Sequence, residues 1–136
     1  MKKIIRGICL ISLCVLLTGC FGKKAAANEE KVNKTVIENK NVTKEQEVDG
    51  VKISDIQLSV SDGLSTYTAK VTNESKKEIN IEDIDIIVKD DKDKELVKMI
   101  GYIGETIKPD ETKEIISTTD MDLSKANLIT YKVNKK

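Results

Sequence analysis

Acidic side chains are concentrated between residues 82 and 95, and their spacing points to cation chemistry. Seven carboxylates alternate there with three lysines. Asp91, Asp93 and Glu95 have the spacing of the first three ligands in a calcium loop, but the Gly and Glu that an EF-hand needs further along are replaced by Leu and Tyr. The three acids are therefore candidate Ca²⁺ ligands of a looser turn site. The alternative is a solvated hairpin tip whose charges discourage pairing of strand edges.

Catalysis by paired carboxylates is a second interpretation of the same acids, and the rest of the inventory argues against it. A glycosidase needs two acids in a cleft that gives them different environments, whereas these acids alternate with Lys in expected turns. The chain has no His, the usual general base and commonest metal ligand. Its only Arg is Arg6, so the rest of the chain lacks a bidentate clamp for phosphate. We expect a protein that is not an enzyme and has no catalytic residue or cofactor.

Tyr102 lies between Gly101 and Gly104 and is a candidate contact residue. It could be exposed for recognition of a partner, or it could be an ordinary core or strand-end residue.

The N-terminus has the features of a secretion signal. Lys2, Lys3 and Arg6 precede an apolar run over residues 8–17. A membrane-spanning helix needs about 20 apolar residues, and this run has about half that length. The sequence therefore predicts a signal peptide over residues 1–19.

The four residues Leu17-Thr18-Gly19-Cys20 resemble the bacterial lipobox. In that family the Cys thiol receives a diacylglyceryl group, and the chain is cut just before this Cys. The resemblance implies a lipoprotein with palmitate-type acyl chains on Cys20 and cleavage of the Gly19–Cys20 bond. Two or three acyl chains would anchor it durably at the extracytoplasmic face of the cell membrane, whereas one chain binds only marginally. The alternative is a secreted protein with a chance cysteine.

Removal of residues 1–19 would leave 117 residues, enough for one domain and a tether. Cys9 and Cys14 would leave with the signal and Cys20 would be capped, so the domain would fold without a disulfide. The mature chain would carry 20 basic and 23 acidic residues, a net charge of −3. This balance argues against a nucleic-acid partner, which normally requires a basic patch.

Residues 20–46 are rich in Lys, Glu, Asn and Ala and hold few apolar residues. We expect a flexible tether there, followed by a folded domain over residues 47–136.

Short runs of alternating apolar residues begin after Glu47 and predict strands. The alternation slips at Ser54-Asp55, which indicates a β-bulge or a strand that changes sheets. It slips again at Glu82-Asp83. Turns are expected at residues 61–63, 73–76, 90–93 and 108–111. Residues 122–126 resemble one helical turn capped by Asp122. About seven strands without a long helix predict an all-β, immunoglobulin-like β-sandwich.

Three segments in order resemble the FxLYD family of immunoglobulin-like domains, which occur in bacterial lipoproteins. They are residues 68–75, ending Thr-Asn-Glu-Ser, residues 86–90, and residues 107–112, which contain Pro-Asp-Glu. The aromatic residues that name the family are replaced by Ile86 and Lys89. The resemblance implies a fold and an envelope location, and no common catalytic activity.

These observations favour a non-enzymatic interaction module of the bacterial cell envelope. The membrane would be one partner, through the N-terminal lipid, and another envelope protein would be the second, through pairing with a strand edge. The alternative is a surface domain that binds or senses Ca²⁺ or a small ligand.

Overall fold

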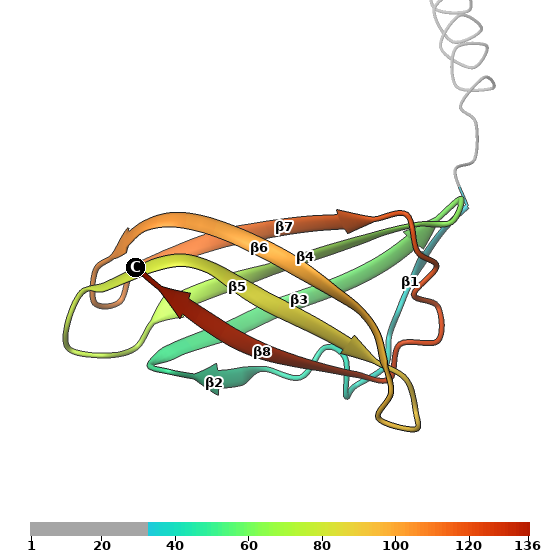
Figure 1. Cartoon of the computed structure of the whole chain (residues 1–136), viewed down its shortest axis with the longest axis horizontal. Helices are drawn as coiled ribbons and strands as arrows, with labels where there is room; N and C mark the ends of the chain where they lie inside the picture. Colours follow the sequence, from blue (N-terminus) through green and yellow to red (C-terminus); the bar gives the residue numbers. More distant parts are fainter. Residues whose placement is uncertain (1–32) are drawn as a thin grey trace, which may run out of the picture. The chain divides into compact units, whose positions relative to one another are not determined.

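The computed structural model describes residues 33–136, which form two antiparallel β-sheets packed face to face (Figure 1). No helix occurs among these residues. The predicted all-β, immunoglobulin-like sandwich is confirmed. The predicted signal peptide and Cys20 lie outside the described residues. The eight strands are β1 (Lys34–Val36), β2 (Gln46–Val48), β3 (Val51–Ser61), β4 (Leu64–Asn73), β5 (Ile79–Lys89), β6 (Glu95–Ile107), β7 (Thr112–Thr119) and β8 (Leu128–Lys135).

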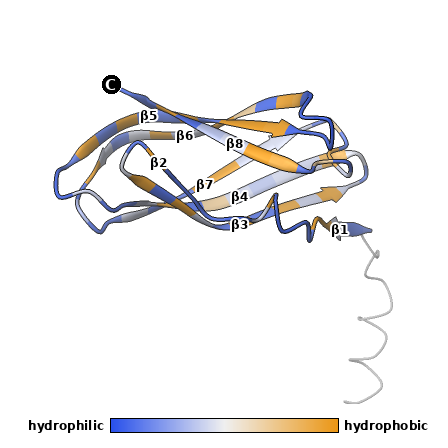
Figure 2. Cartoon of the chain, turned by 90° about the horizontal axis from the view of Figure 1, so that it is seen from below, coloured by the Kyte–Doolittle hydropathy of each residue, from blue (hydrophilic) through white to orange (hydrophobic). Residues whose placement is uncertain are grey.

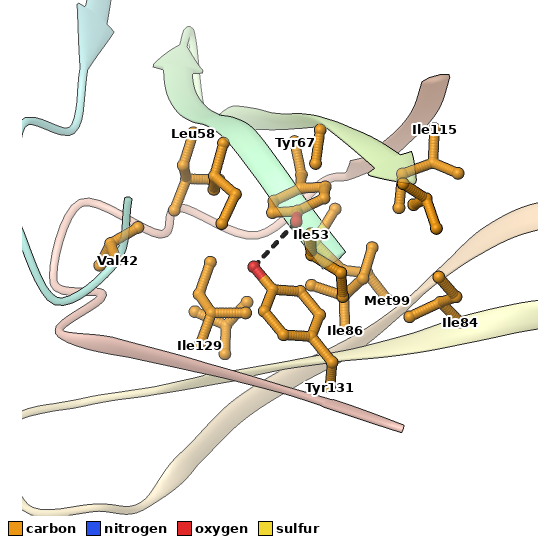
Figure 3. Packing of buried hydrophobic residues seen from close by; sticks show 14 of the residues in the cluster. Val42, Ile53, Leu58, Tyr67, Ile84, Ile86, Met99, Ile115, Ile129 and Tyr131 are labelled. Carbon is orange, nitrogen blue, oxygen red and sulfur yellow. Dashed lines mark hydrogen bonds between the residues drawn. The ribbon is translucent and has the colours of Figure 1, made fainter. Parts of the chain in front are cut away.

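The sheets are connected in a Greek-key pattern. The first sheet has the order β1-β3-β4-β7, with β2 also paired to β3, and the second has the order β6-β5-β8. The chain crosses between sheets after β4, β6 and β7, as in immunoglobulin-like sandwiches. Apolar residues recur along the strands (Figure 2), and their inward side chains fill the core between the sheets (Figure 3).

The slip at Ser54-Asp55 is a β-bulge, the first of its two interpretations, and the slip at Glu82-Asp83 is also an irregularity of register. The register of β3 against β4 shifts between Ser54 and Gln57, and the register of β5 shifts between Ile81 and Asp83. An extra residue turns the following side chains to the other face, so apolar residues stay buried on both sides of each slip. The segments before and after the first bulge form one strand, β3, rather than two.

Residues 33–46 are not the flexible tether that the sequence predicted. Strand β1 pairs with β3, the Ile37 amide donates to the Leu58 carbonyl at 2.8 Å, and the Val42 side chain is fully buried. Two apolar residues are enough to hold this segment against the domain, because Ile37 and Val42 enter a core built by other strands and need not form an apolar face of their own. The domain boundary expected at residue 47 is therefore wrong. We call residues 33–48 the N-terminal arm.

The N-terminal arm joins the two sheets along one side of the sandwich. The Gln46 amide donates to the Ile129 carbonyl of β8 at 2.7 Å, while β2 itself pairs with β3. The Asn39 amide donates to the Asn127 side-chain oxygen at 3.0 Å. The arm thus contacts the outer edge of β8 near its start, at Ile129.

The opposite side of the sandwich is formed by β6 and β7, whose outer edges pair with no other strand of the described domain. Gly101 of β6 faces Ile115 of β7, and a Cβ at Gly101 would lie 2.7 Å from the Ile115 Cδ1. Glycine at this position lets the two sheets approach and close the core there.

The predicted helical turn at residues 122–126 is wrong in type. The Asp122 carboxylate accepts from the Ser124 amide at 2.9 Å, and the Ala126 amide donates to the Leu123 carbonyl at 2.9 Å. Leu123 and Ala126 are buried. This is a single side-chain-supported turn, from which the chain enters β8.

Candidate functional site

The acidic hairpin between β5 and β6 is organised by Asp90. Its carboxylate oxygen Oδ1 accepts hydrogen bonds from the backbone amides of Lys94 and Lys92, at 3.0 and 2.8 Å. These two bonds favour the charged form and hold the pKa of Asp90 below its usual range. The Asp90 amide donates to the Lys94 carbonyl at 2.9 Å, which closes the turn. The carboxylate of Asp90 is therefore part of the turn.

Aspartate has a conformational role throughout the described domain. Its five non-glycine residues with positive φ are all aspartates: Asp49, Asp55, Asp62, Asp93 and Asp110. Aspartate tolerates the left-handed region better than most residues because its short side chain can bond the local backbone. The abundance of acids in the turns thus has a structural explanation that requires no bound cation.

The structure does not bring the three predicted Ca²⁺ ligands together. Asp93 accepts from the Lys89 ammonium at 3.0 Å, and Asp91 and Glu95 are exposed. Within residues 33–136, no three acidic side chains are grouped so that they could hold a metal ion. The hairpin is a solvated tip, as the alternative interpretation of these acids expects.

A buried acid, which no pattern in the sequence indicated, lies on the outer face of the second sheet. Asp85 is 5% exposed, and its carboxylate contacts the Lys98 ammonium at 2.8 Å and the Asn134 amide at 3.2 Å. The same amide nitrogen donates to Asp83 at 2.7 Å. The hydrogen bond to Asp85 raises the pKa of Lys98. This network connects β5 to both neighbouring strands, β6 through Lys98 and β8 through Asn134.

Strand β6 carries exposed apolar side chains beside this network. Ile100 is 54% exposed and Tyr102 is 66% exposed, on the outward face that also holds Lys98. We call Lys98, Ile100 and Tyr102 the β6 strip. Of the two interpretations of Tyr102, the structure supports the exposed residue.

Gly104 supports the position of Tyr102. Gly104 has a φ of +70°, and a Cβ there would collide with the Tyr102 ring and hydroxyl. The ring therefore lies against the bare backbone of Gly104, which fixes its direction at the edge of the sheet.

No protein-family model, curated protein or solved structure matches this chain. The resemblances to the lipobox and to the FxLYD family therefore stay predictions. Within residues 33–136, no helix is long and apolar enough to cross a membrane.

Proposed function

We propose that this protein is a lipid-anchored, extracytoplasmic lipoprotein whose β-sandwich is a non-enzymatic interaction module of the cell envelope. The basic start, the short apolar run and Leu17-Thr18-Gly19-Cys20 support the anchor. The carboxylates of the domain support a non-enzymatic role, because the buried acid Asp85 is engaged in an ion pair and Asp90 in a turn.

The observation that carries the proposal is the β6 strip at an unpaired sheet edge. The N-terminal arm contacts the edge at β8 through Gln46, whereas β6 has no neighbouring strand on its outer side among the described residues. Exposed edges are the places where a partner chain can add a strand. Tyr102 and Ile100 supply the exposed aromatic and aliphatic groups that commonly anchor such contacts.

In-cell photo-crosslinking tests this function. A photoreactive amino acid replaces Tyr102 or Ile100 in the full lipidated chain, and Lys70, exposed on the other sheet, is the matched control position. The proposal requires that one identified envelope protein is captured from positions 100 and 102 and not from 70. Equal capture from all three positions, or none, would contradict it.

The anchor is tested in the same experiment with Cys20→Ala. Loss of lipid should reduce the capture because the effective concentration at the membrane falls. Capture that is unchanged in Cys20→Ala would show that the anchor is not needed for the contact.

A further inference from the structure

The outer face of the first sheet is divided into two halves of different chemistry. The half beside Asn33 holds Lys34 and Val36 of β1, Leu64 of β4 and Ile116 of β7. The strand positions between them are Ser, Thr and Gln residues, as the register of β3, β4 and β7 shows. We call these four residues, with the hydroxyl and amide side chains between them, the exit face.

The exit face is apolar and hydroxylated, and its strand positions contain no acid. Val36 is 50% exposed, Leu64 is 48% exposed and Ile116 is 63% exposed. Asp62 and Asp120 lie in the turns at its rim. Lys34 is the one charged residue among its strand positions in the described domain.

The other half of the same sheet face is charged. Lys70 of β4 forms an ion pair with Asp55 at 2.8 Å, and Glu114 and Lys52 lie at neighbouring outward positions. The three exposed apolar side chains thus lie on the uncharged half of this face, separated from one another by Ser, Thr and Gln positions, with Ile116 opposite Thr68 at its border with the charged half.

The chain joins the domain at the edge of the exit face. Lys34 pairs with Ser61, next to the hairpin that leads to Leu64 (Figure 1). The proposed lipid site, Cys20, is 14 residues before Lys34. Fourteen residues reach at most about 50 Å when fully extended, and an 11-residue strand such as β3 is about 36 Å long. The proposed anchor therefore keeps the domain near the bilayer surface, and the exit face lies beside the point at which the chain enters the domain.

We propose that the exit face rests on the lipid bilayer. Val36, Leu64 and Ile116 would enter the boundary between headgroups and acyl chains. The hydroxyl groups around them would bond lipid headgroups, and Lys34 would meet an anionic phosphate. The inference rests on the proposed lipid anchor, which keeps the face beside the membrane so that a weak contact is sufficient.

This contact would orient the sandwich. The exit face lies on the outside of the first sheet, and the β6 strip lies on the outside of the second. With the first sheet on the lipid, Ile100 and Tyr102 point away from the membrane, where another envelope protein can reach them.

Single-cysteine labelling of the full lipidated protein tests the contact. Leu64→Cys, Ile116→Cys and the control Tyr102→Cys are each labelled with the fluorophore NBD on vesicles of phosphatidylglycerol and phosphatidylethanolamine. We expect a blue-shifted emission and protection from an aqueous quencher at positions 64 and 116, with neither at 102. Equal quenching at all three positions on vesicle-bound protein would overturn the inference.

Labelling at Cys20 distinguishes a failure of the proposed membrane contact from a failure of the proposed lipid anchor. In the parent protein a lipidated Cys20 takes up no label, and the protein stays with the vesicles. Labelling of Cys20 would overturn the proposed anchor itself. Protection at 64 and 116 in a Cys20→Ala background without vesicles, rising with protein concentration, would assign the exit face to a second copy and overturn the lipid contact.

Discussion

The Tyr67 hydroxyl donates a hydrogen bond of 2.9 Å to the Tyr131 hydroxyl in the centre of the core (Figure 3). Tyr67 belongs to β4 and Tyr131 to β8, so the bond connects the two sheets. The rings are tilted by 53° with centroids 6.4 Å apart. Two polar groups thus satisfy each other within the hydrophobic core.

Removing both of these hydroxyls should cost less than the sum of the two single removals. Tyr67→Phe or Tyr131→Phe leaves the remaining hydroxyl buried without its partner, which costs about 1–3 kcal/mol of unfolding free energy. The double variant removes both polar groups and should be less destabilised than the sum of the two. Denaturant unfolding of the four proteins measures the coupling. Additive effects would mean that the hydrogen bond contributes little.

The same pair makes the fold sensitive to alkali. Burial is the main cause that raises the pKa of both tyrosines above the ordinary value of 10.0. The unfolded chain therefore loses these protons above about pH 10 while the folded chain keeps them, so stability is complete below pH 10 and falls as pH rises further. Each tyrosine contributes a slope of about 1.4 kcal/mol per pH unit. The free energy of unfolding between about pH 9 and 12 should fall less steeply with pH in Tyr67→Phe than in the parent protein. An unchanged slope would refute the role of the buried Tyr67 hydroxyl in this pH dependence.

Asn73 connects four segments at the end of the sandwich distal to the exit face. Its buried amide donates to the carbonyls of Lys77 and Ile107 at 2.7 and 2.9 Å, and its oxygen accepts from the amide and hydroxyl of Ser75 at 2.9 and 2.7 Å. Its backbone bonds Glu111 and Asp110 of the turn before β7.

Asn73→Asp should therefore destabilise the domain by about 3 kcal/mol. The carboxylate cannot donate to the two carbonyls, and it places a charge beside them in a buried site. The matched control is Asn80→Asp at an exposed position of β5, for which the change should stay within about 0.5 kcal/mol. Thermal unfolding compares the two, and similar losses would contradict the role of Asn73.

Two valines in the N-terminal arm test the corrected domain boundary. Val42 is fully buried and Val36 is half exposed. Val42→Ala should cost about 2 kcal/mol through lost burial and a cavity, whereas Val36→Ala should cost less than about 0.5 kcal/mol. If Val42→Ala leaves the urea midpoint unchanged, the arm does not belong to the cooperative unit.

Calcium should not stabilise the protein. Asp91, Asp93 and Glu95 are not grouped into a site, and a cation that binds only the folded state would have to raise the melting temperature. We expect the same melting temperature with millimolar CaCl₂ and with EDTA. A rise that is lost in Asp91→Asn and Asp93→Asn would restore the Ca²⁺ interpretation.

The sandwich and its bulges could be predicted from local patterns in the sequence, because both depend on the alternation of apolar and polar residues. The slips at Ser54-Asp55 and Glu82-Asp83 appear in the sequence as broken alternation and in the structure as register shifts. The turn at Asp90 follows from side-chain chemistry over four residues. Each of these features is decided within a short segment of chain.

Long-range packing could not be read in the same way. The burial of Val42 depends on a space between the sheets that exists only after both have formed. The pairing of Asp85 with Lys98 requires the register of β5 on β6, which no local pattern specifies. The exit face likewise appears only when β1, β4 and β7 are aligned.

The N-terminal arm has a consequence for the order in which the chain can mature. Its contacts from Gln46 to Ile129 and from Asn39 to Asn127 join residues 83 and 88 positions apart. Such distant pairings form slowly because the intervening chain must be closed into a loop first. For a chain exported with its N-terminus leading, the arm can pair with β3 soon after it emerges. Its contacts to Asn127 and Ile129, in contrast, cannot form until β8, the last strand, has also crossed. The link that the arm makes between the two sheets would therefore be the last part of the domain to form.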